Sequence, residues 1–233
     1  MGEFKGMLLE DTAVPARSSF GAAAGIRNMP PGAVRLTQSQ MSSIMQKTMN
    51  DWVPEKDMRS LKYGNFFQSF TAGATGWILN DFFRKRFRVG DMHKMVSFAP
   101  SAIIPAVTAF IIQEALVKNP LMLGELDCPV CAETRSISVQ IGAGFLQPLL
   151  LSFISSAIIA KSNFTTEVPP LTDVVKVGEL FRKMSRPILP HIMILLGLNV
   201  LTASYSTYKQ GRCAILLRER VFGPPQREEL PNY

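Results

Sequence analysis

The sequence has few of the residues from which metal centres and catalytic sites are built. Its 233 residues include two histidines and three cysteines. Cys128 and Cys131 form a lone C-x-x-C pair, whereas a tetrahedral zinc site needs four ligands of the Cys or His type. No set of a serine, a histidine and an acid can be assigned to one site with any specificity. We therefore expect no metal site, no cofactor and no catalytic residues, and we predict that the protein is not an enzyme.

Charge is also scarce, and it is unevenly distributed. Charged residues make up 18% of the chain against 47% hydrophobic residues, a ratio that is high for a soluble protein. A helix needs roughly 20 mainly apolar residues to cross about 30 Å of hydrocarbon. The apolar residues gather in four runs, namely residues 66–83, 96–117, 136–160 and 187–208. The pattern predicts an all-α, polytopic membrane protein with about four transmembrane helices.

The first run is the weakest of the four. It is 18 residues long and contains Gln68, Asn80 and Asp81. Taken alone it also fits a core helix, which would leave three spans. A soluble bundle of unusually apolar helices is the other alternative, but the stretch Ala143–Ile159 has only Gln147 and a few serines, too few polar residues to form the water-facing side that such a bundle needs.

The chain divides into three parts by composition. Residues 1–62 contain scattered prolines and glycines and are expected to be a flexible basic region. They lack acids from Thr12 to Asn50, as mitochondrial presequences do, although an ordinary basic tail has the same composition. An apolar core typical of a secretory signal is absent before residue 60. Residues 63–212 form the predicted four-span domain, and residues 213–233 form a C-terminal tail.

A further helix is expected between the third and fourth runs. Apolar residues recur there at helical spacing, with charged residues on the opposite face. The pattern predicts an amphipathic connector that rests on the membrane surface, or alternatively docks a partner. The apolar positions are Leu171, Val174, Val175, Gly178, Phe181 and Met184.

Small and amide side chains inside the runs indicate helix packing. Small residues four apart let helix backbones approach closely, as in the pairs Ala72 with Gly76 and Ser138 with Gly142. Amides within lipid are expected to form interhelical hydrogen bonds. The spans hold no charged residue near their centres, which argues against an ion or proton pathway. The predicted packing residues are Gly73, Gly76, Gln140, Gly142, Gln147 and Asn199, with Gln140 and Gln147 on a shared face.

Four spans would place both termini and all three cysteines on one side of the membrane, and both histidines on the other. Basic residues in the first and third loops weakly favour the more oxidising compartment for the cysteines. Glu125, Asp127 and Glu133 surround the pair and disfavour a reactive thiolate. We therefore expect Cys128 and Cys131 to form, at most, a local structural disulfide.

Three stretches of the chain resemble the transmembrane protein 126 family. They are NDFFRKRF, GELDCPVCAETRS and LFRKMSRPIL, in that order. The resemblance covers roughly Tyr63 to Lys209. It implies a multi-pass protein of the mitochondrial inner membrane that assists assembly of respiratory complex I. Its implied partners are membrane-arm subunits, other assembly factors and the lipid bilayer, with no nucleic acid.

The resemblance also covers two basic motifs at the ends of predicted spans. They consist of Arg84, Lys85 and Arg86 in the first case, and of Arg182 and Lys183 in the second. Both are expected to orient the protein and to contact lipid headgroups. A small-solute transporter remains an alternative function, although no internal repeat supports it. A thiol-disulfide relay through the C-x-x-C loop is the other alternative.

Overall fold

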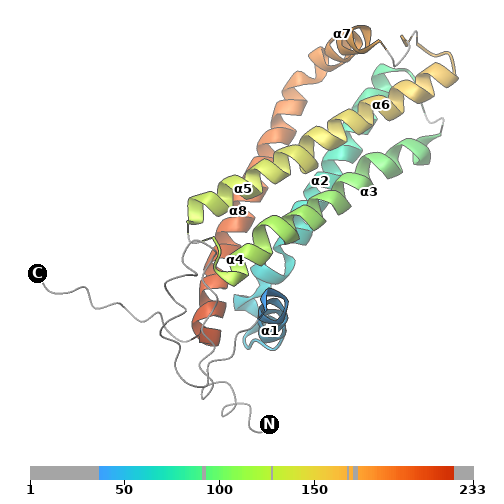
Figure 1. The fold of residues 1–233 in the computed structure, drawn as a ribbon. Coiled ribbons are helices and arrows are strands. Elements are labelled where there is room, and N and C mark those ends of the chain that lie inside the picture. Colours follow the sequence, from blue (N-terminus) through green and yellow to red (C-terminus); the bar gives the residue numbers. More distant parts are fainter. Residues whose placement is uncertain (1–36, 91–92, 127, 167, 170–172, 223–233) are drawn as a thin grey trace, which may run out of the picture.

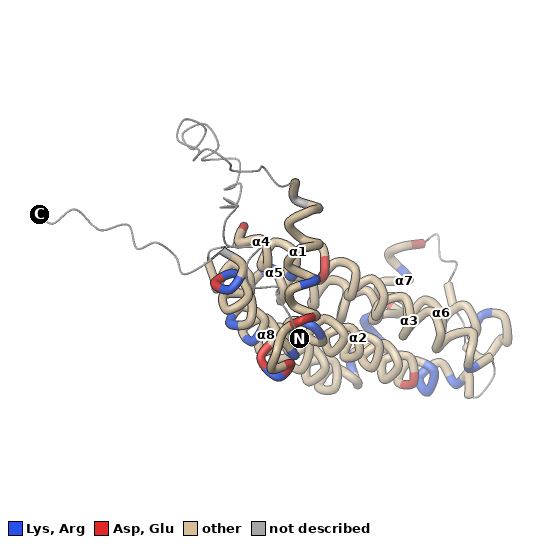
Figure 2. Tube along the Cα trace, turned by 90° about the horizontal axis from the view of Figure 1, so that it is seen from below, with Lys and Arg blue, Asp and Glu red and all other residues tan. Residues whose placement is uncertain are grey.

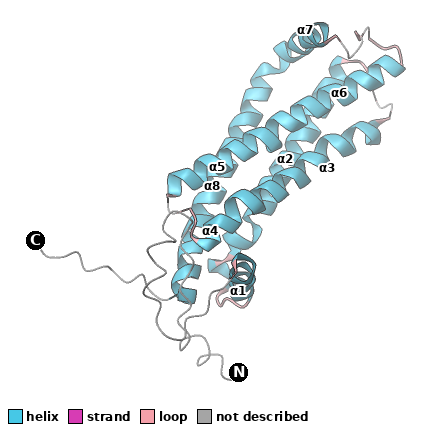
Figure 3. Ribbon diagram, in the orientation of Figure 1, coloured by secondary structure: helices cyan, strands magenta, loops and turns pink. Residues whose placement is uncertain are grey.

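The computed structural model describes residues 37–90, 93–126, 128–166, 168–169 and 173–222. Every regular element in those ranges is helical (Figure 3). The predicted all-α fold is therefore confirmed for the described part of the chain.

The long helices form an elongated bundle in which they lie side by side (Figure 1). Helix α2 contacts α3, α6 and α8. Two of the long helices are each made of two α-helical parts joined by a turn of π-helix. The bundle consists of α2 (Arg59–Arg86), α3 (Lys94–Gln113) continued by α4 (Asn119–Leu123), α5 (Pro129–Ile141) continued by α6 (Gln147–Ser162), and α8 (Leu189–Phe222).

Three helical stretches of the described chain are long and apolar enough to cross a membrane. They are Lys94–Leu123, Pro129–Ser162 and Val174–Val221. Helix α2 has 28 residues but falls short in apolar content, so the predicted count of four is not confirmed. Its shortfall comes from polar side chains such as Asn65, Gln68 and Asn80, which are buried inside the bundle.

The segment just before α2 is helical, within the region over residues 1–62 that was predicted to be flexible. Helix α1 (Gln38–Asn50) begins with a capping box, in which the Gln40 side chain accepts a hydrogen bond from the Thr37 backbone at 2.9 Å. Met45 and Met49 of α1 are buried against Leu217 of α8. A short 3-10 helix (Glu55–Asp57) then leads toward α2. Residues 1–36 of the predicted region lie outside the described part.

The predicted C-terminal tail over residues 213–233 is also corrected. Helix α8 continues to Phe222, and its residues Cys213, Ala214 and Leu217 are buried. The helix continues because these positions meet α1, α4 and α5 at the same end of the bundle. Residues 223–233 lie outside the described part.

The amphipathic connector is present as α7 (Val174–Ser185), joined to α8 by a 3-10 turn (Arg186–Ile188). Its half-buried face packs against the apolar core of the bundle, where the Phe181 ring lies 5.1 Å from that of Phe153. Val174 and Val175 remain exposed. The apolar face of α7 is therefore partly covered by the chain itself, because it packs on an aromatic cluster at the end of the bundle.

Candidate functional site

The polarity of α2 is inverted relative to that of a helix in a soluble protein. Its side toward the other helices contains the buried polar residues Asn65, Gln68, Thr75 and Asn80. Its outer side carries large apolar side chains, of which Phe70 is 72% exposed. Aliphatic and aromatic side chains also cover the outer sides of α3, α6 and α8. Such an exterior suits a hydrocarbon solvent, in which polar groups must be satisfied internally.

Gln140 is at the centre of a buried group of polar side chains, which we call the polar seam: Gln68, Thr71, Thr75, Gln113, Ser136, Gln140 and Asn199. The Gln140 side-chain amide donates to the Gln68 carbonyl at 3.0 Å and to Asn199 Oδ1 at 2.9 Å. Asn199 in turn donates to Thr75 Oγ1 at 2.8 Å. These bonds join α5, α2 and α8 to one another near the middle of the bundle.

The same seam reaches α3 through Gln113. Its side-chain amide donates to the Ser136 carbonyl at 3.0 Å, and the Ser136 hydroxyl donates back to Gln113 Oε1 at 3.3 Å. Gln113 and Ser136 are both fully buried. This pair was not predicted, because nothing in the local sequence around Gln113 indicates that it faces α5.

Gln140 and Gln147 do not share a face, contrary to the prediction. Gln140 is fully buried toward α2 and α8, whereas Gln147 is half-buried and donates to Thr108 Oγ1 of α3 at 3.4 Å. The π turn Gly142–Leu146 lies between them and adds a residue to the helical turn. A spacing of seven residues therefore no longer returns to the same side of the helix.

Two of the predicted packing glycines hold α2 against α3. A Cβ added at Gly76 would collide with the Ser101 carbonyl, and one added at Gly73 would lie 3.2 Å from the Ala102 carbonyl. A third glycine, Gly144, was not predicted. A Cβ there would lie 2.7 Å from the Gln140 amide nitrogen, so this glycine leaves room for the seam. These contacts are all internal to the chain.

The other predicted small-residue pair is open to the outside. Ser138 and Gly142 are both exposed, and a Cβ added at Gly142 would meet nothing within 4 Å. Thr134 lies one turn earlier and is exposed as well. We call Thr134, Ser138 and Gly142 the open α5 face. It is a small-residue surface of the kind against which a second helix packs closely.

The first basic motif is divided between the inside and the outside of the protein. Arg84 is buried, where it donates to Ser97 Oγ at 2.7 Å and also to the Gly90 carbonyl. This corrects its predicted headgroup role, because the turn between α2 and α3 folds back over its guanidinium. Lys85 and Arg86 are exposed, as are Arg182 and Lys183 of α7. Lysine and arginine residues lie mostly toward the two ends of the bundle (Figure 2).

A charged network near the α4 end was also missed by the sequence analysis. The buried Lys118 ammonium lies 2.8 Å from Glu114 Oε1. Glu114 Oε2 accepts from the Asn65 amide at 2.8 Å, and Asn65 Oδ1 accepts from the Gln210 amide at 2.8 Å. The pair is local in sequence, but its amide partners come from α2 and α8. The network therefore ties three helices together and neutralises the Lys118 charge.

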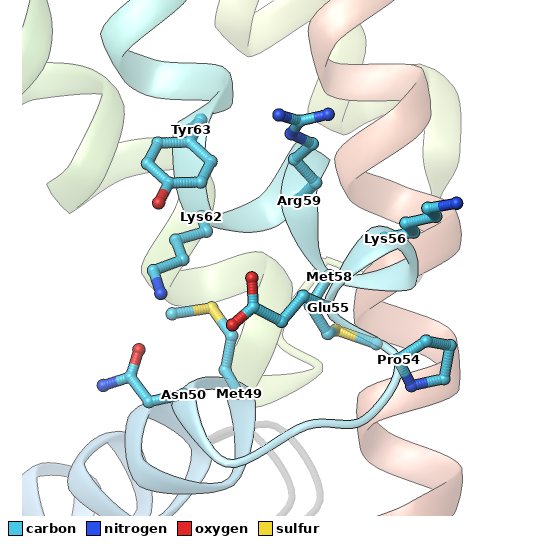
Figure 4. Close-up of a pocket in the computed structure, with 9 residues that line it drawn as sticks. All are labelled: Met49, Asn50, Pro54, Glu55, Lys56, Met58, Arg59, Lys62 and Tyr63. Carbon is cyan, nitrogen blue, oxygen red and sulfur yellow. The ribbon is translucent and has the colours of Figure 1, made fainter.

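A cavity of about 750 Å³ lies at the end of the bundle where α1 meets the start of α2 (Figure 4). Charged side chains of both signs, including Glu55 and Arg59, line it together with Met49, Met58 and Tyr63. The cavity does not reach the polar seam. Its location gives no support to a solute path through the middle of the bundle.

The two cysteines of the C-x-x-C motif lie at the N-terminus of α5. Cys128 is the N-cap, and its sulfur accepts the backbone N–H of Cys131 at 3.3 Å. Both thiols are exposed and free in this structure, and the local disulfide stays a prediction. Hydrogen bonds from the Cys131 side chain and then from its backbone lower the pKa of the Cys128 thiol below its ordinary value. The position of Cys128 at a helix N-terminus was not predicted, since the expectation rested on the compartment and on the nearby acids.

The third cysteine, Cys213, is buried in α8 and donates to the Asp57 carbonyl at 2.9 Å. Ala132, next to Cys131, packs with Ala214, next to Cys213. All three cysteines therefore lie at the same end of the bundle. Within the described residues, no group of three or more His, Cys, Asp or Glu side chains is arranged to hold a metal ion.

Comparison with known proteins gives a consistent family assignment. A family model described as "Transmembrane protein 126" matches residues 39–221. The chain is 27% identical to the protein named transmembrane protein 126 of Drosophila melanogaster, over 88% of this chain and 94% of that relative. It is 29% identical to transmembrane protein 126A of Mus musculus, over 70% of this chain and 81% of the relative.

The similarity extends further than the three motifs indicated. Transmembrane protein 126A of Homo sapiens is 28% identical over 60% of this chain and 74% of its own length. The family match begins within α1 and ends in the last turn of α8, beyond the range Tyr63 to Lys209. No solved structure matches the chain.

Proposed function

The chain belongs to the transmembrane protein 126 family, and we propose that it is a scaffold of the mitochondrial inner membrane that assists assembly of respiratory complex I. Its partners in this proposal are membrane-arm subunits of complex I, other assembly factors and the lipid bilayer. The complex I role comes from the family resemblance of the three sequence motifs. The observation that carries the scaffold role is the open α5 face, which is exposed beside an interior where Gln113, Gln140 and Asn199 bond to neighbouring helices.

We also propose that α2 is the fourth membrane span. At a rise of about 1.5 Å per residue its 28 residues extend about 42 Å, which exceeds the hydrocarbon thickness. Its buried amides have partners on α3, α5 and α8, so they do not oppose insertion once the bundle has formed. Its outer side carries exposed aromatic and aliphatic side chains, which lipid would cover.

The fourth span can be tested by labelling from each side of the membrane. Lys56 lies before α2 and Arg88 lies after it, and both are exposed. In a chain whose native cysteines are replaced by serine, Lys56→Cys and Arg88→Cys should react with an impermeant maleimide from opposite sides. Labelling of both from one side would leave three spans.

The interior of the bundle favours a scaffold over a transporter. The seam residues Gln113, Gln140 and Asn199 are each hydrogen-bonded to a neighbouring helix. A transport path needs side chains that exchange their partners for a solute, and transporters place it at discontinuous helices near the midplane. Here the two helices that contain a break, α3–α4 and α5–α6, continue through π turns. The hydrogen bonds of their buried amides join them to neighbouring helices.

The open α5 face is the proposed docking surface for a helix of a membrane-arm subunit. Small residues at positions 134, 138 and 142 permit close backbone approach, and contacts of this kind hold helices together in lipid without a hydrophobic driving force. A scaffold that releases its client needs such a limited interface. The outer sides of the remaining helices carry large side chains that lipid can cover.

The experiment is depletion followed by rescue, read on native gels of mitochondrial membranes. Depletion should lower assembled complex I and raise membrane-arm intermediates, with the other respiratory complexes largely unchanged. The unaltered chain and Gly197→Leu should restore complex I, whereas Gly142→Leu should not. Gly197 is the matched control, since it is also an exposed helical glycine with nothing within 4 Å of an added Cβ.

Normal complex I after depletion would refute the assembly role. Full rescue by Gly142→Leu would instead refute the open α5 face as the docking surface, while leaving the assembly role standing. Localisation to a membrane other than the mitochondrial inner membrane, seen by fractionation, would refute both.

A further inference from the structure

We propose that Cys128 and Cys131 form a redox-active dithiol, which undergoes thiol-disulfide exchange with a disulfide-bearing molecule, Cys128 acting as the attacking thiol and Cys131 as the resolving thiol. This inference does not rest on the proposed assembly function. It rests on the placement of both sulfurs at one turn of α5, their exposure and the hydrogen bonding between them.

Helix α5 places the two thiols within one turn of each other. Cys128 is the N-cap, Pro129 follows at the first helical position, and Cys131 is the third helical residue. The Cys131 N–H points at the Cys128 sulfur across 3.3 Å. The same N–H lies 3.1 Å from the Cys128 carbonyl oxygen, so the two residues are neighbours on the first turn and their sulfurs are placed to close a short disulfide ring.

The two thiols differ in what stabilises their charged forms. A thiolate on Cys128 receives a backbone N–H and lies at the positive end of a 13-residue helix. The hydrogen bonds from Cys131 act in the same direction on Cys128. Cys131 is one turn further along and donates rather than receives. The asymmetry assigns the attack to Cys128, because the thiolate is the nucleophile in exchange.

Access separates this pair from the remaining cysteine. Cys128 and Cys131 are exposed, and Val130 between them is 69% exposed. Cys213 is buried, and its sulfur is engaged with the Asp57 carbonyl. Only the pair can be reached by an external disulfide, and the chain therefore contains its own unreactive reference thiol.

The exchange has two steps. In the first, the Cys128 thiolate attacks one sulfur of the external disulfide, which forms a mixed disulfide and releases the other sulfur as a thiolate that takes a proton from water. In the second, Cys131 loses its proton to water and attacks Cys128 Sγ, which forms the Cys128–Cys131 disulfide and releases the first external sulfur. The chain loses two electrons, the external disulfide gains them, and the reaction is reversible.

The test begins with the full chain in detergent, equilibrated in buffers of reduced and oxidised glutathione and then alkylated. Cys213→Ser should still form one intramolecular disulfide as the oxidised fraction rises. In Cys131→Ser, a glutathione adduct should accumulate on Cys128. In the reduced chain at neutral pH, iodoacetamide should label Cys128 at least about threefold faster than Cys131, because the thiolate fraction sets the rate. Circular dichroism checks that each variant is folded.

A second arm identifies the source of the disulfide. Cys131→Ser expressed in its native membrane is trapped with an acidic quench and run without reducing agent. A thiol-sensitive shift to higher mass on Cys128 indicates a protein partner, and an adduct of glutathione mass indicates the small molecule. Failure to form the intramolecular disulfide at any glutathione ratio, equal labelling of the two thiols, or no adduct in the membrane trap would each overturn the proposal.

Discussion

The small residues of α2 and those of α5 have the same spacing and opposite surroundings. On α2, Gly73 and Gly76 each stand four residues after a small residue, Ser69 and Ala72, and both glycines are covered by the backbone of α3. On α5, Ser138 and Gly142 are exposed, and an added Cβ at Gly142 would meet no other atom within 4 Å. Two small residues spaced four apart therefore indicate a place for close helix approach, but they do not indicate whether the partner helix lies in the same chain.

The same division between inside and outside recurs in the basic motif of α2. Arg84 is buried and hydrogen-bonded to Ser97, whereas the next residue, Lys85, is exposed and paired with Asp81. Adjacent residues of the same charge thus have different roles. The inward member stabilises the fold, and the outward member is available to the surroundings. The following predictions test this contrast in order of decreasing effect on stability.

Gly76→Ala should have the largest effect. The added methyl group meets the Ser101 carbonyl, a backbone atom that cannot rotate away. We expect a loss of about 3 kcal/mol or more, the upper part of the range for overpacking. Unfolding in mixed micelles of increasing denaturing detergent measures it. Gly197→Ala is the control and should be neutral or slightly stabilising, and equal stability of the two variants would contradict the closed packing of α2 on α3.

Arg84→Met should be the next most damaging. It removes charge-assisted hydrogen bonds to Ser97 and to the Gly90 carbonyl, and because the cost of burying the guanidinium offsets part of their gain, we expect a net loss of about 1.5 to 3 kcal/mol for the two together. Lys85→Met is the matched control, because its exposed ion pair contributes about 0 to 1 kcal/mol. The same micelle titration compares them. A greater loss of stability from Lys85→Met than from Arg84→Met would show that this motif acts through headgroup contact and not through the turn after α2.

Asn199→Leu should have an intermediate effect. It removes the bonds that join Asn199 to Gln140 and to Thr75, and interhelical bonds in lipid are worth about 0.6 to 2 kcal/mol each. Gln147→Leu removes a single longer bond at 3.4 Å from a half-buried amide and should cost less. Thermal unfolding of the purified variants gives the order. If the two substitutions cost the same, the polar seam would not be a distinct stabilising unit.

Gly142→Leu should have the smallest effect on stability and a large effect on binding. Its side chain enters open space, so the change in stability should stay within about 0.5 kcal/mol. Purification in mild detergent, followed by quantitative mass spectrometry, should show loss of the bound membrane-arm subunit with Gly142→Leu and its retention with Gly197→Leu. Destabilisation of the isolated chain by Gly142→Leu would mean that the α5 face is covered from within.

The candidate site could be predicted only in part from the sequence. Gly76 and Asn199 were identified as packing residues from their type and their place within apolar runs, and both are buried among other helices. Gln113, Ser136 and Gly144 could not be identified in this way. Their role depends on the contact of α5 with α2, α3 and α8, and no local pattern specifies that contact.

The sequence alone determined that the described chain is helical, where three of the four predicted spans lie, and that the C-x-x-C pair falls at the start of one of the long apolar helices. These properties follow from the length and composition of continuous segments, because lipid requires each spanning segment to satisfy its own backbone. Only the tertiary structure decided that Gly76 is closed and Gly142 open, that Arg84 is buried, and that the π turn separates Gln140 from Gln147. The first three features depend on contacts between residues far apart in the chain. The last depends on the one extra residue in the π turn, which changes the side of the helix that faces its neighbours.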